Sequence, residues 1–223
     1  MFLAGDGLRR LIGGACMVGG AALLLGAASI SLHGRVWQER HAALFAAAQA
    51  AGDRQAPLLP AAQTAQRPLR GEALAHLSIP RLGIGSVVVE GTDPDSLKLG
   101  PGHLEGSALP GQADNCIIAG HRDGAFRRLR TARPGDIVEI TGRTRVDHYR
   151  IDSVETVPKD DLRPLAPSSA PILTLVTCYP FHYVGRAPMR FIVRASLLDD
   201  SAEAPAGAPG GPPGSSRASE AGS

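Results

Sequence analysis

The sequence has 223 residues, 43% of them hydrophobic, with 23 basic and 21 acidic side chains and a formal net charge of +2. This balance gives no domain-wide positive field, so it argues against a nucleic-acid partner. Three cysteines without a CxxC pair form neither a disulfide framework nor a zinc finger, so we expect no bound metal.

An uncharged apolar stretch over residues 11–32 is long enough to cross a bilayer as a helix. At about 1.5 Å per residue it would cover the roughly 30 Å of hydrocarbon. We therefore predict a transmembrane anchor there, with a cytoplasmic N-terminus over residues 1–10 and the bulk of the chain outside the cytoplasm. A signal peptide cleaved near Ala27 and Ala28 is the alternative.

Two segments of biased composition flank the central part of the chain. Residues 33–73 are first rich in Ala and Gln and then broken by Pro57, Pro60 and Pro68, so we predict a helical and then proline-broken stalk. Residues 199–223 are rich in Pro, Gly, Ala and Ser, and we predict a disordered tail.

A compact domain is expected over residues 74–198. It contains seven short β-like runs separated by Gly and Pro: LSIP, IGSVVVEG, NCIIAG, DIVEITG, HYRIDSV, ILTLVTC and RFIVRAS. This pattern favours an all-β barrel or sandwich over alternating βαβ units. Two intervening stretches, 93–99 and 125–129, are predicted to be short helices, the first opened by Asp93 as cap and Pro94 in the first turn.

Cys178 ends the run 172–178 and stands just before Tyr179 and Pro180. A free cysteine is most often a small core residue. However, Pro180 cannot continue a central strand, and period-two alternation places Cys178 on one face with Thr174, which is polar. Two interpretations therefore stay open, a buried core residue and a nucleophile.

A nucleophilic cysteine needs an imidazole or a cation nearby, since a thiol with a pKa of about 8.5 is mostly protonated at neutral pH. Its tetrahedral intermediate also needs a donor for the oxyanion. His121, just past an apolar run, offers the imidazole on a loop or barrel rim. A hairpin-like return would bring Arg190 near the thiol, and by spacing Arg186 and Arg194 are also candidates.

Residues 102–140, together with TLVTCYPF and RFIVRA, resemble the sortase family of cysteine transpeptidases. The motifs are a histidine in an AGHRD-type strand end, a TLxTC signature at 174–178 and an arginine twelve residues later. The resemblance covers essentially all of residues 74–198 and is greatest to sortases of Gram-negative bacteria. It implies a closed β-barrel of about eight strands with short helices, preceded by an N-terminal transmembrane helix.

The resemblance also implies the roles of the site residues. Cys178 matches the nucleophile that forms a thioacyl enzyme, and His121 matches the general acid and base. Arg190 matches the arginine that steadies the substrate and the oxyanion, which selects it over the two neighbouring arginines. Thr177 is expected to shape the rim of the site and Tyr179 to end the strand, both in contact with substrate.

The implied reaction is cleavage of a C-terminal LPxTG-like sorting motif after its Thr, followed by transfer of the acyl group to an amine. The expected partners are a secreted protein with that signal and an amine acceptor, or water in a hydrolytic variant. The expected location is the inner or plasma membrane, with a periplasmic catalytic domain. No cofactor is implied, and no carboxylate cluster identifies the calcium site that some family members have.

Two other functions stay open from the sequence. L,D-transpeptidases also use an extracytoplasmic Cys and His, but their cysteine usually follows Ser-x-Gly, whereas here it follows Leu-Val-Thr. The second is a membrane-tethered β-domain that acts as a binding or assembly module. In that case Cys178 would be buried, or paired with Cys116 in a disulfide that removes the nucleophile.

Overall fold

The computed structural model describes residues 4–52 and 68–198. They form a long helix, α1 (Ala4–Gly52), and a closed barrel of eight strands, so the predicted all-β barrel is confirmed. The strands are β1 (Ala73–Ile79), β2 (Ile84–Glu90), β3 (Gly102–His103), β4 (Asn115–Gly120), β5 (Ile137–Thr141), β6 (Val146–Pro158), β7 (Ile172–Tyr179) and β8 (Met189–Leu197). The short helices are α2 (Pro94–Leu99) and the 3-10 helices η2 (Pro80–Leu82), η3 (Ala125–Thr131) and η4 (Arg163–Leu165). The predicted disordered tail lies outside the described residues.

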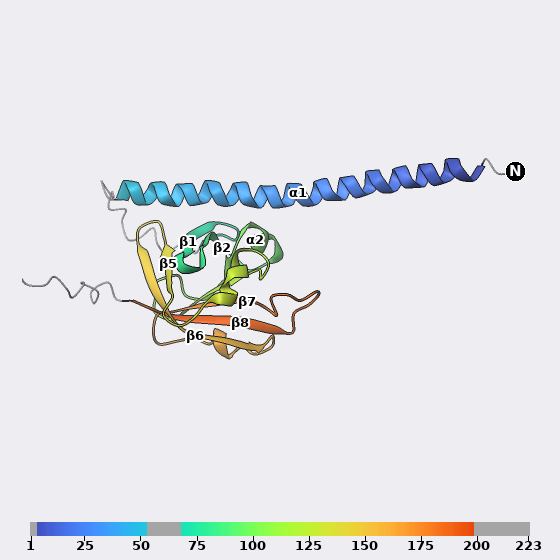
Figure 1. Ribbon diagram of the computed structural model, residues 1–223. Coiled ribbons are helices and arrows are strands. Elements are labelled where there is room, and N and C mark those ends of the chain that lie inside the picture. Colours follow the sequence, from blue (N-terminus) through green and yellow to red (C-terminus); the bar gives the residue numbers. More distant parts are fainter. Residues whose placement is uncertain (1–3, 53–67, 199–223) are drawn as a thin grey trace, which may run out of the picture.

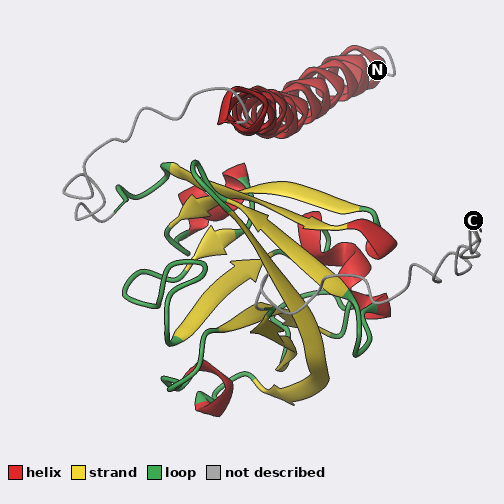
Figure 2. Cartoon of the chain, turned by 90° about the vertical axis from the view of Figure 1, so that its left-hand side faces the viewer, coloured by secondary structure: helices red, strands yellow, loops and turns green. Residues whose placement is uncertain are grey.

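The strand order around the barrel is β1-β2-β3-β4-β7-β8-β6-β5, and β5 pairs back to β1. The pairs β2 with β3 and β4 with β7 are parallel, and the other pairs are antiparallel. Figure 2 shows the strands curving around a common interior, with the short helices at the edge of the barrel. Closure gives every strand of the described barrel a partner on both sides, but β3 pairs with only two residues of β2 and two of β4.

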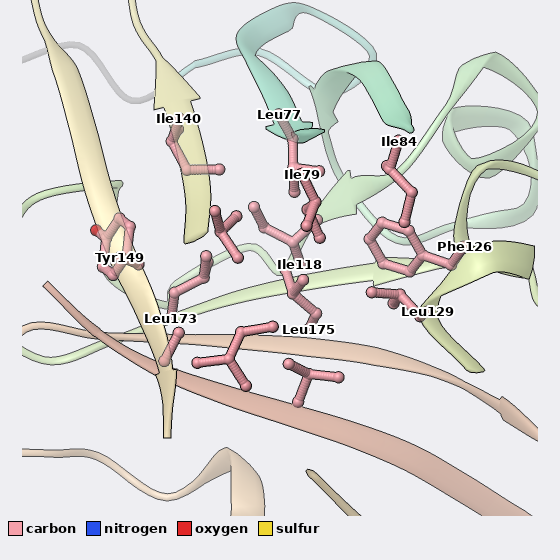
Figure 3. Packing of buried hydrophobic residues seen from close by; sticks show 14 of the residues in the cluster. Leu77, Ile79, Ile84, Ile118, Phe126, Leu129, Ile140, Tyr149, Leu173 and Leu175 are labelled. Atoms are coloured by element: carbon pink, nitrogen blue, oxygen red, sulfur yellow. The ribbon is translucent and has the colours of Figure 1, made fainter. Parts of the chain in front are cut away.

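The interior is filled by alternate side chains of the strands. Leu77 and Ile79 of β1 and Leu173 and Leu175 of β7 are all 0% exposed, and they point toward one another in Figure 3. Residues two positions apart on a strand point to the same face of the sheet. Both pairs therefore follow the period of two that is expected for a sheet with one buried face. Phe126 of η3 closes the same core.

β3 is the one strand that the sequence pattern did not reveal, and a buried polar pair holds it in place. The Nδ1 atom of His103 lies 2.7 Å from a carboxylate oxygen of Glu90, and its Nε2 atom lies 2.9 Å from the carbonyl oxygen of Ala108. The Ser107 hydroxyl lies 3.0 Å from Nε2 as well. Both ring nitrogens are thus engaged, and His103 has a structural role.

The helix predicted at 93–99 is confirmed as α2, and its cap forms as expected. The Asp93 side chain accepts hydrogen bonds from the backbone N–H groups of Asp95 (3.0 Å) and Ser96 (3.2 Å). The hydroxyl of Ser96 also donates to Asp93, which lowers the pKa of that carboxyl. The short helix predicted at 125–129 is confirmed as η3.

The second part of α1 lies against the barrel, where the sequence predicted a stalk. The Gln38 amide nitrogen donates to the carbonyl oxygens of Val87 (3.0 Å) and Leu99 (2.7 Å). Its amide oxygen accepts from the backbone N–H of Val87 (2.7 Å) and the hydroxyl of Ser86 (3.1 Å). One side chain thus pairs with both backbone groups of Val87, as a neighbouring strand would.

Small residues and one aromatic ring complete this contact. A Cβ atom on Gly34 would lie 3.1 Å from the carbonyl oxygen of Lys98, and a Cβ atom on Gly100 would overlap the Gln38 amide. Phe45, two turns further along α1, is only 7% exposed. Figure 1 shows the consequence: α1 runs beside β1, β2 and α2, and its N-terminal part extends beyond the barrel.

None of the helices in the described ranges combines the length and the apolarity needed to cross a bilayer. The membrane anchor over residues 11–32 therefore stays a prediction. The proline-containing part of the predicted stalk, residues 53–67, lies outside the described residues.

The Gln38→Glu variant tests whether docking of α1 stabilises the barrel. It removes both amide donors and places a carboxylate beside two carbonyl oxygens, so we expect the free energy of unfolding to fall by about 1–3 kcal/mol. Denaturant unfolding measures this, and Glu39→Gln, the reverse change at an exposed neighbour, is the control. Equal stability of the two variants would show that the contact contributes nothing.

Candidate active site

The parallel pairing of β4 with β7 brings His121 and Cys178 to the same end of two neighbouring strands. Gly120 pairs with Thr177, so the next residue on each strand is His121 on one and Cys178 on the other. The hydroxyl of Thr177 donates to the carbonyl oxygen of Gly120 at 2.7 Å, and Thr177 is buried. This hydrogen bond joins the two strands just before the candidate catalytic residues.

Arg190 stands directly opposite Cys178 in the antiparallel pair of β7 and β8. Directly opposed residues have Cα atoms about 4.5–5.5 Å apart and side chains on the same face. Arg194 pairs instead with Thr174, four residues away from the thiol. The hairpin-like return predicted from the sequence is therefore confirmed, and the register separates Arg190 from Arg194.

A pocket of about 410 Å³ is lined by Cys178, His121 and Arg190 together. Cys178 is half-buried and His121 is exposed, so both can meet a solute. Thus all three residues predicted for catalysis meet in one place.

Thr177 and Tyr179 do not line this pocket. The Tyr179 ring stacks on Phe191 at 6.3 Å between centroids and meets the edge of Phe181 at 6.1 Å. Thr177 uses its hydroxyl inside the protein, as described above. Their predicted contact with substrate stays a prediction.

Cys116 is not a partner of Cys178. Both thiols are free, and Cys116 is 1% exposed in the core. Cys116 pairs with Leu173, five residues before Cys178, which separates the two thiols by about 16 Å along the strands. That distance is far too long for a disulfide, so the alternative of a Cys116–Cys178 bridge is wrong. Burial raises the pKa of the Cys116 thiol.

Arg122 is a site residue that the sequence reasoning missed. Its guanidinium donates to the carbonyl oxygens of Pro180 (3.1 Å), Tyr183 (2.6 Å) and Gly185 (3.3 Å) in the β7–β8 loop. It also lies 5.8 Å from the centre of the Tyr183 ring. Arg122 thus joins the loop after His121 to the loop after Cys178. The HRD sequence marks this position, but the contacts depend on a loop conformation that no local pattern shows.

Arg190 is also held by the β7–β8 loop. Its Nη1 atom donates to the carbonyl oxygens of Ala187 (3.3 Å), in that loop, and of Met189 (3.0 Å), the first residue of β8. Within the described part of the chain, the other N–H groups of this guanidinium have no partner. They are free to donate to a ligand in the pocket.

A second hollow, of about 470 Å³, is also lined by His121. Its walls come from Gly34 to Glu39 of α1, from the end of α2 and from the loop 121–125. His121 and Asp123 line both hollows, whereas Cys178 lines only the first. His121 therefore borders both hollows.

No group of three or more His, Cys, Asp and Glu side chains within residues 4–52 and 68–198 is arranged to hold a metal ion. The predictions on metal and calcium stay untested.

Comparison with known proteins gives a consistent result. The sequence model of the sortase domain family matches residues 77–198 of this chain. Sortase D of Bacillus subtilis is 37% identical over 128 residues, which are 57% of this chain and 65% of that protein. The chain thus spans just under two thirds of that relative. Bacillus is Gram-positive, so this relative does not support the expected likeness to sortases of Gram-negative bacteria.

Solved structures are similar as well. The sortase D5 transpeptidase of Clostridium perfringens matches with a TM-score of 0.57 and 29% identity, over 62% of this chain and 86% of that one. Sortase C of Clostridium perfringens, solved with the C-terminal cell wall sorting motif, matches with a TM-score of 0.54 and 28% identity, over 59% of this chain and 73% of that one. Because the domain match covers more than half of the 223 residues and includes the whole candidate site, this chain belongs to the sortase family.

Proposed function

We propose that this protein is a cysteine transpeptidase that cleaves an LPxTG-like sorting motif and transfers the acyl group to an amine. The observation that carries the proposal is the register of three neighbouring strands. It places a thiol, an imidazole and a guanidinium at one pocket, from β7, β4 and β8. Acyl transfer by a thiol needs a nucleophile, a general acid and base, and a donor for the oxyanion, and these three groups can supply them.

In the first half-reaction, the Cys178 thiolate attacks the carbonyl carbon of the Thr residue in the motif. The carbonyl oxygen becomes an oxyanion. It accepts hydrogen bonds from the N–H groups of Arg190 that have no partner in the described protein. Collapse of the intermediate breaks the C–N bond and leaves a thioester on Cys178. His121 gives a proton to the leaving amine.

In the second half-reaction, the acceptor amine attacks the thioester carbon and His121 removes its proton. The new amide forms and the thiolate of Cys178 leaves. While the acyl group occupies the pocket at Cys178, the second hollow gives the amine another approach to His121. Water in place of the amine would give hydrolysis.

The substrate and the location are parts of the same proposal. A sortase C from Clostridium perfringens has been solved with a C-terminal cell wall sorting motif, which supports a substrate of that class here. The uncharged stretch over residues 11–32 supports anchoring in the inner or plasma membrane, with the barrel outside the cytoplasm. A secreted protein with the sorting signal would then meet the barrel at the membrane.

Mass spectrometry after mixing the protein with an LPxTG peptide tests the covalent step. We expect an acyl adduct on Cys178, which an added amine such as triglycine releases as a ligated peptide. The Cys178→Ala variant should show neither adduct nor cleavage. The Cys116→Ala variant is the matched control, since that thiol is buried away from the pocket, and cleavage by Cys178→Ala would refute the proposal.

Replacing Arg190 by Lys tests the oxyanion role. Lysine keeps the charge but loses the planar fork of donors, so we expect kcat to fall about 10- to 100-fold. The same change at Arg194, on the same strand but outside this pocket, should leave kcat close to that of the wild type. Equal rates for Arg190→Lys and Arg194→Lys would argue against the role.

Arg122→Lys tests whether the β7–β8 loop must be held. Lysine cannot donate to three carbonyl groups in the arginine geometry, so we expect faster amide hydrogen exchange over residues 181–187 and a kcat/KM about tenfold lower. Arg127→Lys, at an exposed position of η3, is the control and should change neither. Unchanged exchange in Arg122→Lys would show that the loop is held by other contacts.

A further inference from the structure

The pocket at Cys178 has an excess of positive charge. Four cationic side chains and one carboxylate line it: Arg122, Lys159, Arg186, Arg190 and Asp123. The whole chain has a net charge of only +2, so this imbalance is local. A pocket walled by one sign of charge concentrates ligands of the opposite sign.

Two of the four cations already have partners in the protein. Arg122 and Arg190 donate to backbone carbonyl groups of the β7–β8 loop. Lys159 and Arg186 are exposed and, in the described part of the chain, make no hydrogen bond through their side chains. Lys159 has only a contact of 3.9 Å with Asp160, whose side chain is 82% exposed, and such pairs contribute little.

Several other arginines on the surface of the barrel domain are paired with carboxylates. Distances between nitrogen and oxygen atoms of 2.7, 3.0 and 2.6 Å join three such pairs: Arg70 with Glu105, Arg143 with Glu72 and Arg163 with Asp161. Carboxylates are therefore present on this surface, and they form ion pairs with arginines outside the pocket. In the described part of the chain, Lys159 has only the long contact with Asp160 and Arg186 has no printed partner, and both side chains line the pocket that holds the thiol.

The fold places these two cations on one side of the pocket. The strand order is β4, β7, β8, β6, so His121 and Asp123 follow the β4 end and Lys159 follows the β6 end. The backbone N–H of Lys159 donates to the carbonyl oxygen of Pro188 at 3.0 Å, which ties the β6 end to the loop that contains Arg186. A peptide that crosses the pocket from β4 to β6 therefore meets the imidazole first and the two cations last.

We propose that the sorting segment of the substrate has an acidic side chain close to the bond that is cleaved, and that Lys159 and Arg186 receive it. This inference rests on the proposed function, because it names a feature of the peptide that enters the same site. The two cations help the protein to bind this peptide. They attract the acidic side chain at long range and then form a direct ion pair with it. An amide or ammonium group at the same place gains neither.

Alkylation of Cys178 in the full-length protein tests the charge of the pocket without any substrate. Iodoacetate and iodoacetamide react with the same thiolate and differ in charge, so the ratio of their rates reports the local field and not the thiol pKa. We expect this ratio to fall at least about threefold in the double variant Lys159→Gln, Arg186→Gln. Arg127→Gln, an exposed cation outside the pocket, should keep the wild-type ratio.

Peptide cleavage tests the preference itself. We compare LPxTG peptides that have Glu, Gln or Lys at one position at a time, within the motif and beside it. For at least one position we expect kcat/KM to be about tenfold higher with Glu than with Gln, and lower again with Lys. The preference should shrink at high salt and in the double variant.

The outcomes separate the two proposals. Equal cleavage of all peptides, or an alkylation ratio that the double variant does not change, overturns the acidic preference and leaves the transpeptidase proposal intact. If the wild type forms no adduct with any peptide, the transpeptidase proposal fails. In that case a wild-type ratio that falls in the double variant still supports an anionic ligand for this pocket.

Discussion

The parallel pairing of β4 with β7 is the contact on which the site depends. It connects residues more than fifty positions apart in the sequence and sets a histidine and a cysteine at adjacent strand ends. Barrel closure fixes this register, because β3 on one side and β8 on the other are paired as well. A slip by one residue would turn Cys178 toward the opposite face. The hydroxyl of Thr177, donated to Gly120, opposes such a slip at the place where it would matter most.

Arginines have two roles around the pocket. Arg122 and Arg190 stabilise the β7–β8 loop by donating to its backbone carbonyl groups, which an irregular segment cannot pair within itself. Arg186 lies in the same loop without a partner in the described chain. Two arginines thus hold the loop in place, and the loop itself places a third arginine at the pocket. Shape and charge of the pocket therefore depend on the same nine or so residues, and changes in that loop will alter both together.

Much of the fold could be predicted from the sequence because its signals are local. Apolar runs ended by Gly and Pro predicted seven of the eight strands, and Asp93 before Pro94 predicted the cap of α2. β3 has only two residues, which is too short to show a period. The role of Gln38 could not be predicted, since its partners belong to β2 and α2, which lie far along the chain. For the same reason the motif located Cys178 but did not reveal the contacts of Arg122.

The continuous helix α1 adds a geometric condition of another kind. Gly34 lies close to α2 and Gln38 is bonded to β2, and the helix runs unbroken from Ala4 to Gly52. Each residue of an α-helix turns the chain by about 100°. One residue inserted ahead of Gly34 would therefore swing the barrel about a quarter turn around the axis of the N-terminal part. The number of residues in that part therefore sets the direction in which the pocket faces relative to it.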